Sequence, residues 1–401
     1  MKANNVETTD LRKAALSLVL MMGIVSLFSD MTHEGAKSIY GDFLSLAGAS
    51  AAVIGFVSGL GEFIGYALRL LTGYLADKRR NYWQMTFIGY AVNMLAIPLL
   101  ALTLPNGWLW ASLLIVSERV GKAIRQPSKA TIVSFASSQV GTGKAFALQE
   151  FMDQIGAFSG PVLLFLVIYF KPGSQALFDS YRLGFLVLLI PALLTLYFLY
   201  RAKVKFPNPE QFESDSVSGS RLILKRPFIL FLVAVSFLAF GFIDFPILTM
   251  HVARLEVLPA AALPLLYAWA MLVDAFAALA FGWLFDKKGF SVLLFSSLFS
   301  VAFAPFAFLS ESVTSIMIGV TLWGIGMGAQ ESVLKAAVAT LVPKENRSSG
   351  YGLFETSFGL FWFLGSWLMG VLYGYSLPAM VTVSVIAQSI AIVCLLFLRK
   401  K

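Results

Sequence analysis

Acidic side chains in the middle of long apolar stretches are the residues of this sequence most suited to chemistry. Glu62 lies among glycines, Asp274 has no base nearby in its own stretch, and Asp30 lies near the end of another stretch. An ionisable group in an apolar interior is costly and usually functional. We predict that these acids bind protons or contact a charged solute. The alternative is a buried acid that is paired with a base or hydrogen-bonded to a neighbour.

A second concentration of charge is the segment 117–129, whose sequence is SERVGKAIRQPSK. On a helix one face of it would carry Glu118, Lys122, Arg125 and Lys129, with Arg119 about 100° away. Such a stripe is untenable against lipid, so it must face a cavity or another part of the protein. We predict a cavity for solute and protons lined by Asp30, Glu62, Arg69, Glu118, Arg119, Asp153, Asp244 and Asp274.

Charged residues nearer the ends of the apolar stretches predict a mechanical role instead. We expect Glu150 to pair with Arg125 or Lys129, and Glu355 to pair with Lys335. Glu331 precedes Lys335 by one helical turn and belongs to the same set. These pairs would form a gate that closes one side of the cavity.

The elements that must position these residues are membrane-spanning helices. The chain of 401 residues is 58% hydrophobic and 13% charged, against about 25% charged residues in soluble domains. A span needs roughly 20 apolar residues. Twelve stretches qualify: 14–36, 49–76, 82–104, 108–135, 143–170, 180–200, 227–252, 260–285, 290–310, 312–340, 348–374 and 378–398.

The distribution of bases predicts the orientation of these spans. Most lysines and arginines between spans fall in loops on the same side as both termini. Only Lys171, Arg182 and Arg254 lie clearly on the other side. Under the positive-inside rule both termini are cytoplasmic, and the protein is a multi-pass protein of the cell membrane. The polar first ten residues and the absence of a small-residue cleavage site argue against a cleaved signal peptide.

The two halves of the sequence repeat each other. GYLADKRR at 73–80 and GWLFDKKG at 282–289 each follow the second span of their half. The polar, proline- and serine-containing segment 202–226 separates the halves. We predict a six-helix bundle over 1–201, a cytoplasmic linker over 202–226 and a second six-helix bundle over 227–401. In transporters built from such repeats the binding site lies between the halves.

These features together resemble the major facilitator superfamily. Its signature loop is matched by Gly73, Asp77 and Arg79, and a second copy by Gly282 and Asp286. The resemblance implies an all-α membrane protein of two pseudo-symmetric six-helix bundles that works by alternating access. It also implies that Gly73, Asp77, Arg79 and Asp286 belong to the cytoplasmic gate.

A further motif of the same family concerns helix packing. Gly156, Gly160 and Pro161 resemble a fifth-span motif that is often found in antiporters. This resemblance favours export of a small organic solute in exchange for protons. The alternative is proton-coupled uptake of an organic anion, which Arg69, Arg119, Lys122 and Arg125 would neutralise.

Other classes of function are disfavoured by composition. One cysteine and two histidines leave no disulfide and no metal cluster, and no Walker loop indicates use of ATP. We therefore expect no enzyme activity and no cofactor. The net charge of +8 sits in short loops, which indicates membrane topology and not nucleic acid. The expected partners are a small molecule, protons and the lipid bilayer, with the chain acting as a monomer. A lipid scramblase or membrane scaffold stays open.

Overall fold

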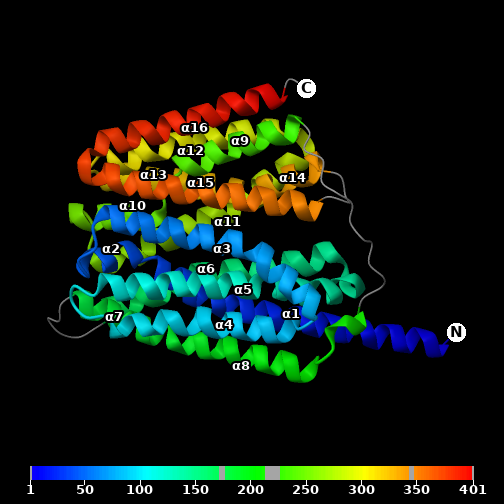
Figure 1. Cartoon of the computed structure of the whole chain (residues 1–401). Coiled ribbons are helices and arrows are strands. Elements are labelled where there is room, and N and C mark those ends of the chain that lie inside the picture. The colour runs from blue at the N-terminus through cyan, green and yellow to red at the C-terminus, as the bar shows by residue number, and fades with distance from the viewer. Residues whose placement is uncertain (1, 171–176, 213–225, 343–346, 400–401) are drawn as a thin grey trace.

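The computed structural model of the protein describes residues 2–170, 177–212, 226–342 and 347–399, and every regular element in these ranges is a helix. Long helices run side by side along one common direction (Figure 1). They form two groups, which we call the first bundle (up to residue 212) and the second bundle (from residue 226). The all-α membrane fold predicted from the sequence is confirmed.

The first bundle begins with the longest helix of the chain. Its elements are α1 (Lys2–Lys37), α2 (Tyr40–Leu46), α3 (Ala51–Arg79), α4 (Tyr82–Leu99), η1 (Leu100–Leu102), α5 (Trp108–Val140), α6 (Thr142–Tyr169), α7 (Leu177–Val187), α8 (Leu189–Lys205) and η2 (Pro209–Phe212).

The second bundle repeats this plan. Its elements are α9 (Arg226–Gly241), α10 (Phe245–Leu255), η3 (Ala260–Ala262), α11 (Leu263–Lys288), α12 (Ser291–Phe308), α13 (Val313–Ala329), η4 (Gln330–Leu334), α14 (Lys335–Leu341), α15 (Arg347–Tyr375) and α16 (Leu377–Arg399).

Eleven segments of the described chain are long and apolar enough to cross a membrane, against the twelve that we predicted. The predicted span 108–135 is the one that is not apolar enough by composition, because its charged stripe lowers its hydropathy. It is nevertheless part of α5, a continuous helix of 33 residues packed among the others. At 1.5 Å per residue this helix is about 50 Å long, more than a bilayer core requires.

Two predicted spans are interrupted where polar residues occur. The span 227–252 is split into α9 and α10, because Asp244 caps the start of α10 by accepting a hydrogen bond from the Phe245 amide, and Pro246 follows. The span 312–340 contains a π turn, η4, which includes Glu331. Such π turns occur frequently at functional sites.

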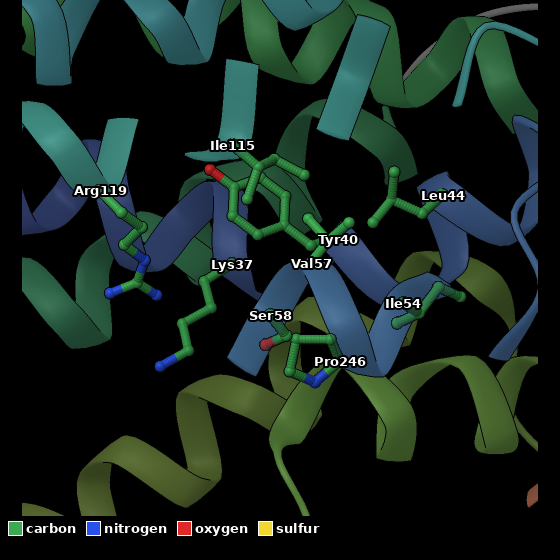
Figure 2. A pocket seen from close by; sticks show the side chains of 9 residues that line it. All are labelled: Lys37, Tyr40, Leu44, Ile54, Val57, Ser58, Ile115, Arg119 and Pro246. Atoms are coloured by element: carbon green, nitrogen blue, oxygen red, sulfur yellow. The ribbon is translucent and has the colours of Figure 1, made fainter. Parts of the chain in front are cut away.

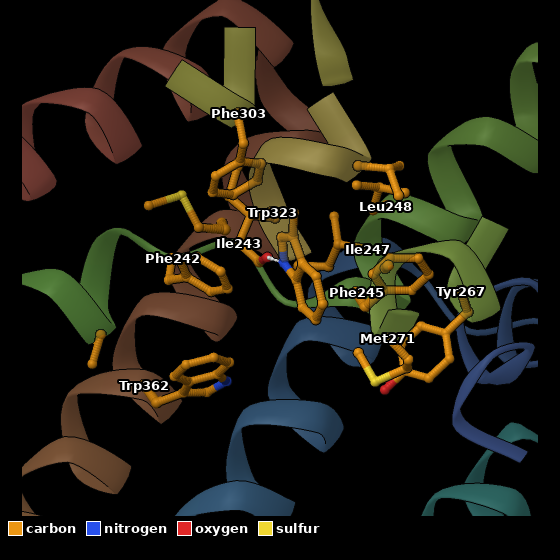
Figure 3. Packing of buried hydrophobic residues seen from close by; sticks show 14 of the residues in the cluster. Phe242, Ile243, Phe245, Ile247, Leu248, Tyr267, Met271, Phe303, Trp323 and Trp362 are labelled. Atoms are coloured by element: carbon orange, nitrogen blue, oxygen red, sulfur yellow. Dashed lines mark hydrogen bonds between the residues drawn. The ribbon is translucent and has the colours of Figure 1, made fainter. Parts of the chain in front are cut away.

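Aromatic packing in the second bundle supports the break between α9 and α10. Trp323 contacts both Phe242 and Phe245 beside the break (Figure 3), and its indole donates a 3.0 Å hydrogen bond to the carbonyl of Ile243. An unwound segment inside a membrane protein must have its backbone groups satisfied by other parts of the protein. This indole supplies one such partner.

Outward faces carry the apolar residues expected next to lipid. On α8 the large side chains of Ile190, Leu193 and Tyr197 are exposed, whereas Ala192 and Leu199 are buried. In water such a surface would be a liability, but hydrocarbon is its natural solvent.

Glycines bring α1 and α6 unusually close together. A Cβ atom at Gly156 would overlap the carbonyl oxygen of Leu27, and one at Gly160 would overlap that of Met31. Pro161 follows inside α6. The Gly-x-x-x-Gly spacing predicted from the sequence thus coincides with backbone contact between the first and fifth spans, the usual role of small residues in membrane helix pairs.

The predicted linker 202–226 is only partly a separate segment. Helix α8 continues to Lys205, and Phe206 and Phe212 are buried against the first bundle. The carbonyls of both phenylalanines accept hydrogen bonds, from Trp83 and Gln139. The start of the predicted linker therefore belongs to the first bundle, and residues 213–225 lie outside the described chain.

The close contact of α1 with α6 generates a stability prediction. The variant Gly160→Val should lower the free energy of unfolding by about 1–3 kcal/mol, because its side chain must displace the α1 backbone. The midpoint of thermal unfolding of the detergent-purified protein measures this. Gly65→Ala is the matched control, since a Cβ at Gly65 meets no atom within 4 Å. Equal effects of the two changes would contradict the packing argument.

Candidate functional site

The two bundles touch at the end of the molecule that carries α2 and α10, on the left in Figure 1, which we call the closed end. Ser58 of α3 donates a hydrogen bond to Asp244, and Tyr267 of α11 donates one of 2.5 Å to Glu34 of α1. We call these two hydrogen bonds the closing contacts. A Cβ at Gly41 would overlap the carbonyl of Pro246, so here the two bundles meet at the level of their backbones.

A second contact between the bundles runs along α3 and α15. Gly55 and Gly59 lie against the backbone of Ser366 and Phe363. Further toward the termini, Arg69 of α3 lies 3.6 Å from Glu355 of α15. The prediction that Glu355 pairs with Lys335 is therefore wrong. The sequence showed which residues are charged but not how α15 is placed beside α3.

Glu118 is the centre of a buried polar network within the first bundle. Its side chain has no exposed surface, and its oxygens lie 2.9 Å from Nδ1 of His33 and 3.3 Å from Nε of Arg119. The amide of Asn93 from α4 also donates to it. Glu118 thus connects α1, α4 and α5, and it does not face an open cavity as predicted.

Arg119 connects this network to Glu62. Its Nη2 atom lies 2.9 Å from the carboxylate of Glu62, and Nζ of Lys37 lies 3.8 Å from the same carboxylate. The Glu62 side chain is 15% exposed. Of the two roles considered for Glu62, this geometry favours the paired acid over the free proton carrier, because protonation would remove the carboxylate charge that two buried bases share.

A small cavity lies beside these residues at the closed end (Figure 2). Its walls come from both bundles: Lys37, Tyr40, Leu44, Ile54, Val57, Ser58, Ile115, Arg119 and Pro246. The volume that the centre of a water molecule can occupy in this cavity is about 10 Å³, which is enough for about one water molecule. In this conformation the cavity is too small for an organic solute.

Arg125 and Lys129 are buried inside the first bundle, next to hydroxyl and amide groups. Arg125 donates to Tyr90 and Ser29 at 3.1 Å and to Asn93 at 3.3 Å, and Lys129 donates to Ser26.

The predicted pairing of Glu150 with either of these bases is wrong. Glu150 is exposed and accepts a 3.3 Å hydrogen bond from Gln154. The carboxylates that interact electrostatically with Lys129 are instead Asp153 and Asp30, from α6 and α1.

Asp274 lies on α11 where the second bundle faces α6 of the first. It is 2% exposed, its Oδ1 atom has no hydrogen-bond partner, and its Oδ2 atom lies 3.5 Å from the amide nitrogen of Gln154. Its strongest electrostatic neighbours are Glu331, Glu150 and Glu34, all of them acids. Within the described chain it has no ion pair with a base.

The remaining predicted gate residues lie toward the termini. Gly73 faces Pro127, and the corresponding Gly282 faces Ser332, so the two halves place their signature glycines in the same way. Glu331, Lys335 and Arg79 are exposed. The side chains of Asp77 and Asp286 lie outside the described part of the structure.

Two residues of the closing contacts, Ser58 and Tyr267, were not predicted from the sequence. Both side chains are neutral, so a search for charge does not find them. Helical spacing was a usable signal: Ser58 precedes Glu62 by one turn, and Tyr267 precedes Asp274 by two. Among the described residues, no three or more histidine, cysteine, aspartate or glutamate side chains lie together in a way that could hold a metal ion.

Comparison with known proteins is informative across the whole chain. The family model described as Major Facilitator Superfamily matches residues 14–320 and 258–401. An uncharacterised protein of Mycobacterium tuberculosis is 36% identical over 396 residues, which cover 96% of this chain and 94% of that protein. An uncharacterised MFS-type transporter of Methanocaldococcus jannaschii is 30% identical and covers 94% and 92%.

Solved structures agree in fold. The nucleoside transporter NupG superimposes with a TM-score of 0.72 at 15% identity, covering 96% of this chain and 98% of that one. A bacterial homologue of the human lysosomal transporter Spinster, in an inward-facing and unoccupied conformation, gives 0.69 at 15% identity and covers 96% and 95%. At this identity the likeness concerns the fold alone.

The buried network generates a second stability prediction. Arg119→Gln should cost about 3–5 kcal/mol of unfolding free energy, because Glu62 and Glu118 lose a buried partner. The double variant with Glu62→Gln should cost less than the sum of the two single changes. Arg201→Gln, a change at an exposed arginine on α8, serves as control and should stay within about 0.5 kcal/mol. Denaturation in detergent measures all four proteins, and additive losses would contradict the pairing.

Proposed function

The chain belongs to the major facilitator superfamily and is a multi-pass membrane transporter of some solute, and from this premise we propose that it exports a small organic solute in exchange for protons. The exchange works by alternating access, in which two bundles expose a shared site first to one side of the membrane and then to the other. Because both bundles belong to one chain, a monomer suffices. We place the transporter in the cell membrane with both termini in the cytoplasm.

Closure of the closed end by contacts between the bundles is the observation that supports alternating access, while α3 and α15 stay in contact along their length. The closing contacts and the backbone contact at Gly41 join the bundles at the closed end. Toward the termini, Glu150, Glu331 and Lys335 are exposed. Hydrogen bonds between side chains can be exchanged for water when the bundles rock, so the closing contacts suit a gate that breaks and re-forms.

The proton site that we propose is Asp274. A buried carboxylate without a base in contact is much more costly than a neutral carboxylic acid, so this site binds a proton readily. Its place between α11 and α6 means that movement of the bundles changes its surroundings. Glu62, which the sequence suggested for the same task, is held by Arg119 and Lys37 and keeps the role of a structural ion pair.

Export is supported by the packing motif of α6. Gly156 and Gly160 contact the backbone of α1 in the way that their resemblance to an antiporter motif suggests. Uptake of an organic anion is less well supported. It requires available bases, yet Arg119 is paired with acids and Arg125 already donates to four neutral side chains.

The closing contacts generate a prediction about accessibility. In a background with Cys394→Ser, the variant Val57→Cys places a thiol at the buried cavity of the closed end. Adding Asp244→Asn should raise its rate of maleimide labelling about tenfold or more, because a hydrogen bond to a charged acceptor contributes roughly 1.5–3 kcal/mol. Asp179→Asn, at an exposed acid on α7, is the control. Unchanged labelling would show that Ser58 and Asp244 do not hold this end shut.

The proton site generates a prediction about coupling. In vesicles loaded with a mixture of cell metabolites, outward solute flow through the wild-type protein should acidify the lumen, as an internal pH dye reports. Asp274→Asn should abolish this acidification, because an amide cannot bind and release the proton. Infrared spectra of the same variant should lack one protonated-carboxyl band.

Glu62→Gln is the matched comparison and should retain both signals if it folds. Solute efflux without acidification by the wild-type protein would refute proton coupling. Loss of the signals in Glu62→Gln alone would move the proton site to Glu62.

A further inference from the structure

Charge is distributed unequally between the two bundles. Of the charged residues described above, the first bundle contributes six bases: Lys37, Arg69, Arg119, Lys122, Arg125 and Lys129. The second bundle contributes one such base, Lys335, and its acids are Asp244, Asp274, Glu331 and Glu355. Glu355 is paired with Arg69 of the first bundle. The interface is therefore acidic on the side of the second bundle.

Asp274 lies among these acids. The elements packed against it present only acidic or neutral polar groups among its principal electrostatic partners: Glu34 from α1, Glu150 and Gln154 from α6, and Glu331 from η4. Its Oδ1 atom is buried without a hydrogen-bond partner. Two separate observations, the surrounding acids and the unpartnered buried oxygen, thus point to a missing positive charge.

We infer that the transported solute is an organic cation, and that Asp274 holds its positive charge at the position where the proton binds when the solute is absent. This inference rests on the proposed proton-coupled transport and adds the class of solute. One carboxylate then serves two ligands that exclude each other. The exchange is balanced in charge: the carboxylic acid releases one proton to water, and the cation becomes the counter-ion of the carboxylate.

A route to Asp274 is marked by the exposed acids. Glu150 and Glu331 lie on opposite bundles, are both exposed, and both act electrostatically on Asp274. Acids that line an entrance raise the local concentration of cations. Gln154 covers Asp274 in this conformation, so the cation reaches the carboxylate only after α6 and α11 have moved apart.

The alternative charge classes fit less well. An anion would lie beside Asp274, Glu331 and Glu150 without a base in contact, which is strongly unfavourable. A neutral solute would leave the carboxylate without a counter-ion unless the proton stayed bound, and then no exchange with protons would occur at this site.

The experiment uses the detergent-purified full chain and a matched set of probes. The cations are a series from tetramethylammonium to tetraphenylphosphonium. The anion is tetraphenylborate, and the neutral compound is triphenylphosphine oxide. At alkaline pH at least one cation should raise the thermal midpoint, and the anion and the neutral compound should not. In weakly buffered solution at acidic pH the same cation should release protons, which a pH dye detects.

Variants at Asp274 test whether this residue is responsible for cation binding and proton release. Asp274→Asn should weaken cation binding roughly 30-fold or more and abolish proton release, since truncating one partner of a buried charge pair has an effect of this size. Asp274→Glu, which keeps the charge, should restore part of both signals and guards against misfolding. Asp179→Asn is the matched control on an exposed acid and should behave as wild type.

The outcomes separate the two proposals. Failure of every cation to stabilise the protein, or equal binding by Asp274→Asn, overturns the inference. If the vesicle assay still shows proton-coupled efflux in that case, the proposed function survives with a different solute class. Cation binding without proton release would show that the cation and the proton do not share a site. If, in addition, solute efflux does not acidify the vesicles, the proposed proton coupling is overturned as well.

Discussion

The cost of burying charge determines how this protein is built. Glu118 has no exposed surface, and it is tolerated because His33, Arg119 and Asn93 surround its carboxylate. Removing an ion from water costs several kcal/mol even after relaxation, and only dense pairing compensates it. The charges of α5 therefore hold the helices of the first bundle in fixed relative positions.

In the described part of the chain, the core of the second bundle is stabilised by aromatic packing and not by a network of ion pairs. Beside the break between α9 and α10 this core is aromatic. Trp323 donates a hydrogen bond to a backbone carbonyl (Figure 3), and the Phe242 ring packs against the Trp323 ring in a tilted arrangement. Few ion pairs hold it, so its buried acids are left for other partners. The charges of the first bundle are mostly paired with one another, whereas Asp274 of the second bundle has no base in contact, and this difference is the basis of the proposed exchange of protons and cations.

The sequence predicted the helices well and their contacts poorly, for a physical reason. Apolar length defines a span, so the fold followed from composition and repeats. The break before α10 was not predicted, although Asp244 and Pro246 are residue types that favour a helix start. A charged stripe defines only the direction in which a helix face points. Whether Glu355 meets Lys335 or Arg69 depends on the neighbouring helix, which no local pattern encodes. The different surroundings of the acids in the first and second bundles became visible only when the neighbouring helices were known.

Glu62 and Asp274 show why the neighbours decide function. Both are acids in the middle of the second span of a six-helix half, and the sequence suggested the same role for both. Arg119 and Lys37 stabilise the negative charge of the Glu62 carboxylate, so this acid gains little by exchanging partners. The charged groups that act most strongly on Asp274 are acids, so each ligand that brings a positive charge relieves the same unfavourable energy. In the proposed exchange this carboxylate binds a proton or a cation but never both, and the high energy of the unliganded, buried carboxylate disfavours a change of sides without either ligand, so the two movements are opposed.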